Sequence, residues 1–114
     1  MENNVLSWAK ALAQGLEPRS YSFAADAVPI GECTAILDFK IWAKYTMGIS
    51  CYFSEIDTGR KFQLTVYLDP IYQHYFIRDV PVNFANCPLN EKYLVRVGSF
   101  GKEKPKLQYA EIIP

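Results

Sequence analysis

Three successive stretches of alternating side chains between Cys33 and Leu68 constrain the fold of this chain more than any other feature of its sequence. Alternation with a period of two predicts half-buried β-strands, because neighbouring side chains of a strand point to opposite faces of the sheet. The apolar positions of the first and third stretches are Cys33, Ala35, Leu37, Phe39, Ile41 and Ala43, and then Phe62, Leu64, Val66 and Leu68. We place these side chains on the inner face of an antiparallel sheet.

The middle stretch has a less decided pattern, since apolar and aromatic residues occupy both of its faces. We assign Ile49, Cys51 and Phe53 to the inner face, although the opposite face could also pass as core. Residues 45–48 and 55–60 connect the stretches, and each contains a glycine of the kind that tight turns require. Both connections have hairpin length, so we expect the three strands to form a meander.

Two helices and a final hairpin are predicted around the meander. Apolar residues at helical spacing over residues 2–16, with Asn3 or Asn4 as N-cap, predict an amphipathic helix of about three turns. The pair Asp69-Pro70 is typical of a helix start and predicts a second helix after the third strand. Alternation near the C-terminus predicts two more strands, with these residues inward: Tyr93, Val95, Val97, Leu107, Tyr109 and, less regularly, Ile113.

The resulting order of three strands, a helix and two strands is that of the five-stranded OB barrel. We therefore predict a mainly β fold, an OB-like barrel over residues 33–113 with an added N-terminal helix. An SH3-like barrel or an α+β roll with a helix on one sheet would show a similar order. At 114 residues the chain is long enough to bury its core as a single domain, residues 1–114.

The balance of charges limits the classes of partner. Lys and Arg together number 12, as do Asp and Glu, so the formal net charge is zero. This balance excludes a globally basic nucleic-acid binder but is compatible with a local basic face. Aromatic residues make up 15% of the chain, more than a core of this size needs, so we expect some of them at the surface or at an interface.

Cysteine usage and hydropathy bear on metal content and location. Cys33, Cys51 and Cys87 are odd in number and lack the CxxC spacing of a zinc site. We expect buried free thiols, no metal and no cofactor. No apolar run approaches bilayer length, and no basic segment followed by an apolar stretch opens the chain. We therefore expect a cytoplasmic protein that makes no membrane contact.

The polar face of the predicted meander is the best functional clue. It would display aromatic rings among lysines, and the loop between the last two strands adds residues of the same types. Single-stranded nucleic acids bind such surfaces, because every base can stack on an aromatic ring while lysine neutralises the backbone phosphates. OB barrels bind oligonucleotides on this strand face and its neighbouring loops. The predicted nucleic-acid-binding residues are Lys40, Trp42, Lys44, Tyr52, Lys61, Tyr67, Phe100, Lys102 and Lys104.

The C-terminal residues carry a resemblance. The stretch from Tyr93 to Phe100, followed by a Gly-Lys loop and by residues 107–114, resembles the last hairpin of the small single-stranded-DNA-binding proteins of filamentous phages. It covers about 20 residues. The resemblance implies cooperative, sequence-tolerant binding of single-stranded DNA by exposed aromatic residues and lysines, often as a dimer. The chain departs from those proteins in its long predicted N-terminal helix and its zero net charge.

Other interpretations fit the same pattern. The N-terminal helix could lie over Trp42, Tyr52 and Tyr67 through Trp8 and Leu12, which would make a second small core. The aromatic face or the helix could instead dock a protein partner or a second copy of the chain, or could block an enzyme as a small phage or plasmid inhibitor would.

An enzyme is not expected. The acidic residues of the chain form no catalytic motif, and no Ser or Cys lies in the setting of a nucleophile. His74, the single histidine, falls on the predicted second helix without a partner for general-base chemistry.

Overall fold

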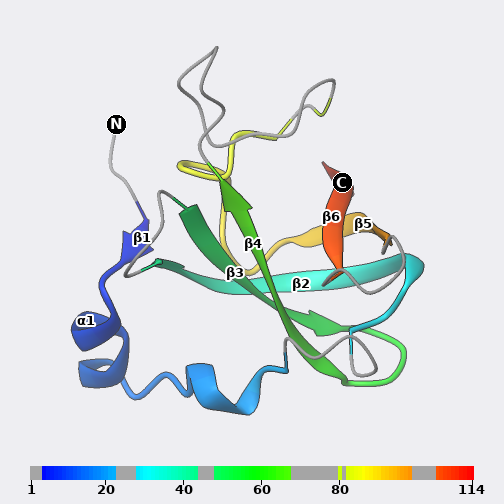
Figure 1. The fold of residues 1–114 in the computed structure, drawn as a ribbon. Coiled ribbons are helices and arrows are strands. Elements are labelled where there is room, and N and C mark those ends of the chain that lie inside the picture. Colours follow the sequence, from blue (N-terminus) through cyan, green and yellow to red (C-terminus); the bar gives the residue numbers. More distant parts are fainter. Residues whose placement is uncertain (1–3, 23–27, 44–47, 68–79, 81, 99–104) are drawn as a thin grey trace.

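The computed structural model describes residues 4–22, 28–43, 48–67, 80, 82–98 and 105–114, and over these ranges the chain is mainly β (Figure 1). The elements are β1 (Val5–Leu6), α1 (Trp8–Ala13), the 3-10 helix η1 (Pro18–Ser20), β2 (Gly31–Trp42), β3 (Gly48–Glu55), β4 (Lys61–Tyr67), β5 (Lys92–Gly98) and β6 (Lys106–Ile112). The helix predicted to begin at Asp69 lies outside the described residues. No helix in the described ranges is long and apolar enough to cross a membrane.

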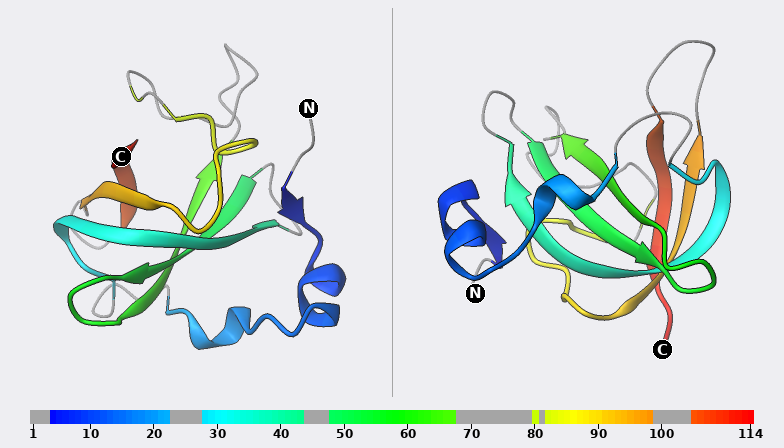
Figure 2. Two further views of the ribbon diagram at one scale, coloured as in Figure 1. Left: turned by 180° about the vertical axis from the view of Figure 1, so that it is seen from behind. Right: turned by 90° about the horizontal axis from the view of Figure 1, so that it is seen from below.

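The strands form one open sheet in the order β4-β3-β2-β5-β6, and β1 pairs in parallel with β2. The predicted meander is confirmed, since β2, β3 and β4 are antiparallel neighbours. β5 returns to pair with β2 rather than with β4, so four consecutive strands form a Greek key. The sheet curls strongly, and its edge strands β4 and β6 come close to each other (Figure 2).

The main core contains the inward side chains of the sheet. The predicted inner faces of three strands are confirmed, and their residues in this core are Ile49, Cys51, Phe53, Phe62, Leu64, Val66, Tyr93, Val95 and Val97. The rings of Phe53 and Phe62 stack with centroids 5.4 Å apart. Phe84, from the turn that precedes β5, is fully buried in the same cluster. The inner faces of β3, β4 and β5 therefore follow from local periodicity.

A β-bulge in β2 reverses the faces of its second half. The register of β2 with β3 shifts between Leu37 and Phe39, which leaves Asp38 as an extra residue. One inserted residue moves every later side chain to the other face of the sheet. Phe39 and Ile41 were predicted to point into the main core and do not, whereas Lys40 was predicted to point outward and is fully buried.

The outer face of β2 carries a second, smaller core as a result of the bulge. Its buried members are Ala11, Tyr21, Phe39, Ile41 and Tyr52. The Phe39 and Tyr52 rings stack 4.5 Å apart, and Tyr21 meets both edge-on at 5.3 Å. Such aromatic pairs add to the stabilisation from buried area alone.

The N-terminal segment differs from the predicted three-turn helix. Its first strand pairs with β2, and α1 begins only after Ser7, whose hydroxyl accepts a hydrogen bond from the Lys10 backbone N at 3.2 Å. The segment does cover part of the outer face, as one interpretation required, but it does so through Ala11. Trp8 and Leu12, the residues expected to cover that face, are 40% and 51% exposed.

β6 also departs from the predicted alternation. The register of β5 with β6 shifts between Arg96 and Val97 and leaves Gln108 as an extra residue. Ala110 is therefore buried in the main core in place of Tyr109. The Tyr109 ring lies instead 5.4 Å from the Arg96 guanidinium on the outer surface.

Candidate functional site

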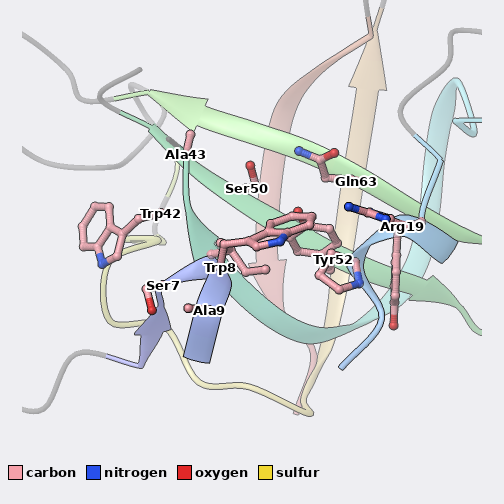
Figure 3. Close-up of a pocket in the computed structure, with 12 residues that line it drawn as sticks. Ser7, Trp8, Ala9, Arg19, Trp42, Ala43, Ser50, Tyr52 and Gln63 are labelled. Atoms are coloured by element: carbon pink, nitrogen blue, oxygen red, sulfur yellow. The ribbon is translucent and has the colours of Figure 1, made fainter. Parts of the chain in front are cut away.

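An open groove of about 970 Å³ lies between the N-terminal segment and the outer face of the sheet (Figure 3). α1 and η1 form one side, and β2, β3 and β4 form the other. The side chains that line it are Ser7, Trp8, Ala9, Pro18, Arg19, Tyr21, Ile41, Trp42, Ala43, Ser50, Tyr52 and Gln63. Most of these are apolar or aromatic, with a few polar groups, which is the usual character of a ligand site.

Both tryptophans of the chain line this groove. Trp8 is the first residue of α1, where the Ser7 cap sets the direction of the helix, and Trp42 is the last residue of β2. The two residues are 40% and 37% exposed, so each keeps part of its surface available to a ligand. Figure 3 draws Trp8 over the middle of the groove and Trp42 at one end.

The floor of the groove is aromatic and uncharged. Tyr52 and Tyr21, both buried, belong to the second core and line the groove with parts of their rings. Burial, reinforced by a hydrogen bond from its hydroxyl to Asp38, raises the pKa of Tyr21 above its ordinary value. Burial also raises the pKa of Tyr52. Both phenols are therefore neutral at physiological pH, and the floor offers flat, uncharged surface.

Positive charge gathers at the end of the groove away from Trp42. Arg19 is the one charged side chain in the described lining, and no carboxylate lines the groove with it. Lys61, an exposed residue on the outer face of β4, places its Nζ 5.2 Å from the centroid of the Tyr21 ring. This end of the groove suits an anionic or acceptor-rich group.

The segment that carries Arg19 is held firmly against β4. The backbone N of Ser22 donates to Lys61 O at 3.2 Å, and Gln63 N donates to Ser22 O at 2.8 Å. These two bonds form a parallel bridge between Ser22 and Phe62. The Tyr21 hydroxyl adds a 2.8 Å bond to Asp38. η1 is thus tied to two strands immediately after Arg19.

The predicted binding residues divide into three groups. Trp42 lines the groove, and Lys61 and Tyr67 are exposed on β4, although neither is in the groove lining. Two predictions of exposure were wrong: Tyr52 is buried as part of the floor, and Lys40 is buried in the main core. The remaining residues lie outside the described ranges: Lys44, Phe100, Lys102 and Lys104.

Lys40 is buried and bonded to backbone carbonyls, not exposed on the surface. Its ammonium donates to the carbonyl oxygens of Phe84 at 2.8 Å and of Cys87 at 3.0 Å, and its Nζ lies 3.6 Å from Cys87 Sγ. Burial lowers the pKa of Lys40, and the neighbouring Cys87 and Cys51 oppose that shift. Both cysteines are buried free thiols, whereas Cys33 is half-buried. Lys40 therefore joins the 84–87 turn to the sheet and cannot contact a ligand in the groove.

The sequence did not point to Arg19, and it did not indicate how exposed Trp8 is. Helical spacing over residues 2–16 favoured burial of Trp8, because it placed Trp8 on the apolar side of a three-turn helix. Ser7 followed by Trp8 could have indicated a later helix start, since serine is a preferred N-cap. Arg19 has no such local signal, because its position depends on the long-range bridge between Ser22 and β4.

No protein-family model, curated protein or solved structure matches this chain. The function of the groove therefore has to be inferred from its own geometry and chemistry.

Proposed function

We propose that this protein is a non-enzymatic binder of single-stranded nucleic acid, specifically single-stranded DNA, and that the groove between α1 and the sheet holds the strand. The observation that carries the proposal is the joint presence of two half-exposed tryptophans and an arginine without a carboxylate neighbour in one groove. Bases stack on Trp8 and Trp42, while Arg19 and Lys61 supply positive charge.

Stacking gives this arrangement its affinity. A base stacked on an aromatic side chain contributes roughly 1 to 3 kcal/mol, irrespective of its sequence. The two indoles that line the groove thus provide about 2 to 6 kcal/mol, which the cationic end supplements. Because the groove is open and its indoles are only partly exposed, a single strand with accessible base faces suits it better than a duplex whose bases are already stacked.

The strand topology supports the proposal, because it fits an OB-like barrel. β2, β3 and β4 form the meander, β5 returns to β2, and the edge strands β4 and β6 approach each other, as a partly open Greek-key barrel requires. In OB domains the faces of the second and third strands bind oligonucleotides, and these correspond to β3 and β4 here. Ser50, Tyr52 and Gln63 bring those two strands into the groove.

Tryptophan fluorescence tests the proposal directly, because both tryptophans of the chain line the groove. An oligothymidine strand should quench the emission in a saturable way. If one or two phosphates are neutralised, affinity for a single strand should fall roughly 3- to 12-fold between about 50 and 300 mM salt. Absence of quenching at micromolar protein in low salt would refute the proposal.

A matched pair of variants separates stacking from folding. Trp8→Ala should weaken binding by roughly 5-fold or more, because it removes one stacking ring. Ile56→Ala removes a side chain of similar exposure, 44%, in the turn after β3, and should leave binding unchanged. Thermal midpoints of both variants should stay close to that of the wild type, since surface substitutions have small effects on stability.

A protein partner is the second candidate, and the zero net charge of the chain favours it. Trp, Tyr and Arg are the residue types that dominate the energy of protein interfaces, and all three line the groove. Leu12, 51% exposed on α1, would extend an apolar contact beyond Trp8. Under this alternative, oligothymidine fails to quench the tryptophans, and Trp8→Ala instead abolishes capture of a specific protein from the host extract.

A further inference from the structure

The cationic end of the groove has features that go beyond general affinity for a strand. Arg19 lies in the lining itself, beside Gln63 and at the opposite end from Trp42 (Figure 3). Lys61 stands outside the lining, close to the Tyr21 ring. A lysine binds an anion as a point charge, whereas the planar guanidinium of an arginine can hold two acceptors in one plane, on a phosphate or on the edge of a base.

The backbone that carries Arg19 is anchored to the rest of the molecule on both sides. Arg19 belongs to η1, whose first residue, Pro18, is buried. Only three residues later, Ser22 is bound to β4 by two backbone hydrogen bonds, and the Tyr21 hydroxyl is bound to Asp38. An anchored backbone keeps the base of the Arg19 side chain at one place beside the groove, which favours recognition of a defined edge over loose charge attraction.

Nothing in the described lining competes for the guanidinium. The groove contains no carboxylate, and no ion pair joins Arg19 to any described residue. The neighbouring Gln63 amide nitrogen donates to Thr65 Oγ1 at 3.3 Å, and no hydrogen bond joins the Gln63 amide oxygen to Arg19 among the described residues. Arg19 therefore presents unpaired donors to the space in which a base would lie.

We infer that Arg19 selects guanine, by donating from its planar fork to the O6 and N7 acceptors of an unpaired base held in the groove. This inference rests on the proposed function and adds a base preference to it. On the edge that carries N7, guanine presents two adjacent acceptors, whereas adenine places an amino donor beside N7 and thymine offers a single acceptor. An unpaired cytosine also has adjacent acceptors, N3 and O2, on its pairing edge, so the inferred selection is for guanine over adenine and thymine. Stacking on the groove tryptophans holds the base in the groove without itself distinguishing one base from another.

The test compares three nonanucleotides, oligothymidine and the same strand with a central guanine or a central adenine, by fluorescence quenching of the wild-type protein. The guanine strand should bind about tenfold more tightly than either of the others. Adenine is the essential control, because it stacks as a purine but lacks the acceptor pair. Equal affinity for the guanine and adenine strands would overturn the inference and leave the proposed function standing.

Two variants complete the test. Arg19→Lys keeps the charge but loses the fork, so the preference for the guanine strand over the adenine strand should fall below about twofold. Lys92 is exposed on β5 and lies outside the groove lining. Lys92→Gln removes a positive charge there and should keep the full preference for the guanine strand. A preference that survives in Arg19→Lys would refute the role of Arg19. If none of the three strands binds, both the inference and the proposed function fail.

Discussion

Lys40→Ala is the substitution for which the structure makes the sharpest statement about stability. Lys40 is fully buried, and its ammonium donates to the carbonyls of Phe84 and Cys87. An exposed lysine on a strand can be replaced by alanine at little cost. If the β-bulge places Lys40 inward as described, the same substitution should instead behave like truncation of a core residue.

The magnitude follows from three contributions. Removal of the buried four-carbon stem leaves a cavity, which costs about 2 to 5 kcal/mol for a side chain of this length. Phe84 O loses its donor, at about 1 to 3 kcal/mol, whereas Cys87 O retains the Asn4 side-chain amide at 2.9 Å. Release of the buried charge offsets several kcal/mol of this loss. We expect a net decrease of about 3 kcal/mol in the free energy of unfolding.

Lys40→Met separates these contributions. Methionine retains most of the stem, and the carbonyl left without a donor nearly cancels against the release of the buried charge, so the free energy of unfolding should stay within about 1 kcal/mol of the wild type. Lys92→Ala, at an exposed lysine of β5, should stay within about 0.5 kcal/mol of the wild type. Urea denaturation followed by circular dichroism measures all three. A loss below about 1 kcal/mol for Lys40→Ala would show that this side chain is not in the core.

The pH dependence gives an independent readout of Lys40. Because burial lowers its pKa in the folded state, the unfolded chain retains the proton over the range between that lowered pKa and the usual lysine value near 10.5. Stability rises with pH wherever the unfolded state binds more protons. The free energy of unfolding of the wild type, minus that of Lys40→Met, should therefore increase as the pH rises towards 10.5. A difference that stays flat over that range would refute the shift.

Three further substitutions test other parts of the molecule. Phe39→Ala should cost about 3 to 5 kcal/mol in urea denaturation because it empties the second core, and a loss under 1 kcal/mol would mean that this cluster is not packed. Thr58→Val should raise the pKa of Glu55, since the hydrogen bond from the Thr58 hydroxyl is the main cause of its lowered pKa. The variant should therefore be less stable than the wild type at neutral pH but not at a pH below the folded pKa of Glu55. An unchanged Glu55 titration by NMR would contradict this. Gly15→Ala should cost about 1 to 2 kcal/mol from its φ of 79° alone, because nothing lies within 4 Å of the added methyl; an unchanged midpoint would contradict it.

The inner faces of β3, β4 and β5 could be predicted from the sequence because alternation is a local property. Each of these strands keeps its period along its described length, so one assignment of inside and outside serves every residue in it. The meander followed for the same reason, since short glycine-containing connections leave neighbouring strands little choice of partner. The candidate site was anticipated in part, at Trp42.

The second half of β2 could not be predicted in this way. Its residues alternate without interruption, and no glycine or proline marks Asp38 as the extra residue. The bulge is accompanied by long-range contacts, since the Asp38 carboxylate accepts hydrogen bonds from Tyr21 and from Ser54. A single residue inserted there sends Lys40 inward and Phe39 outward, which converts a predicted lysine platform into a small aromatic core.

What the sequence by itself determined about this protein is its mainly β character, the meander of β2 to β4 and the apolar side of three strands, because these depend on side chains two residues apart. The tertiary structure alone decided which aromatic rings stay accessible. Trp8 and Arg19 reach the groove through the pairing of β1 with β2 and of Ser22 with β4, and Tyr52 becomes its floor through contact with Phe39. These contacts join residues far apart in the chain, and no local period encodes them.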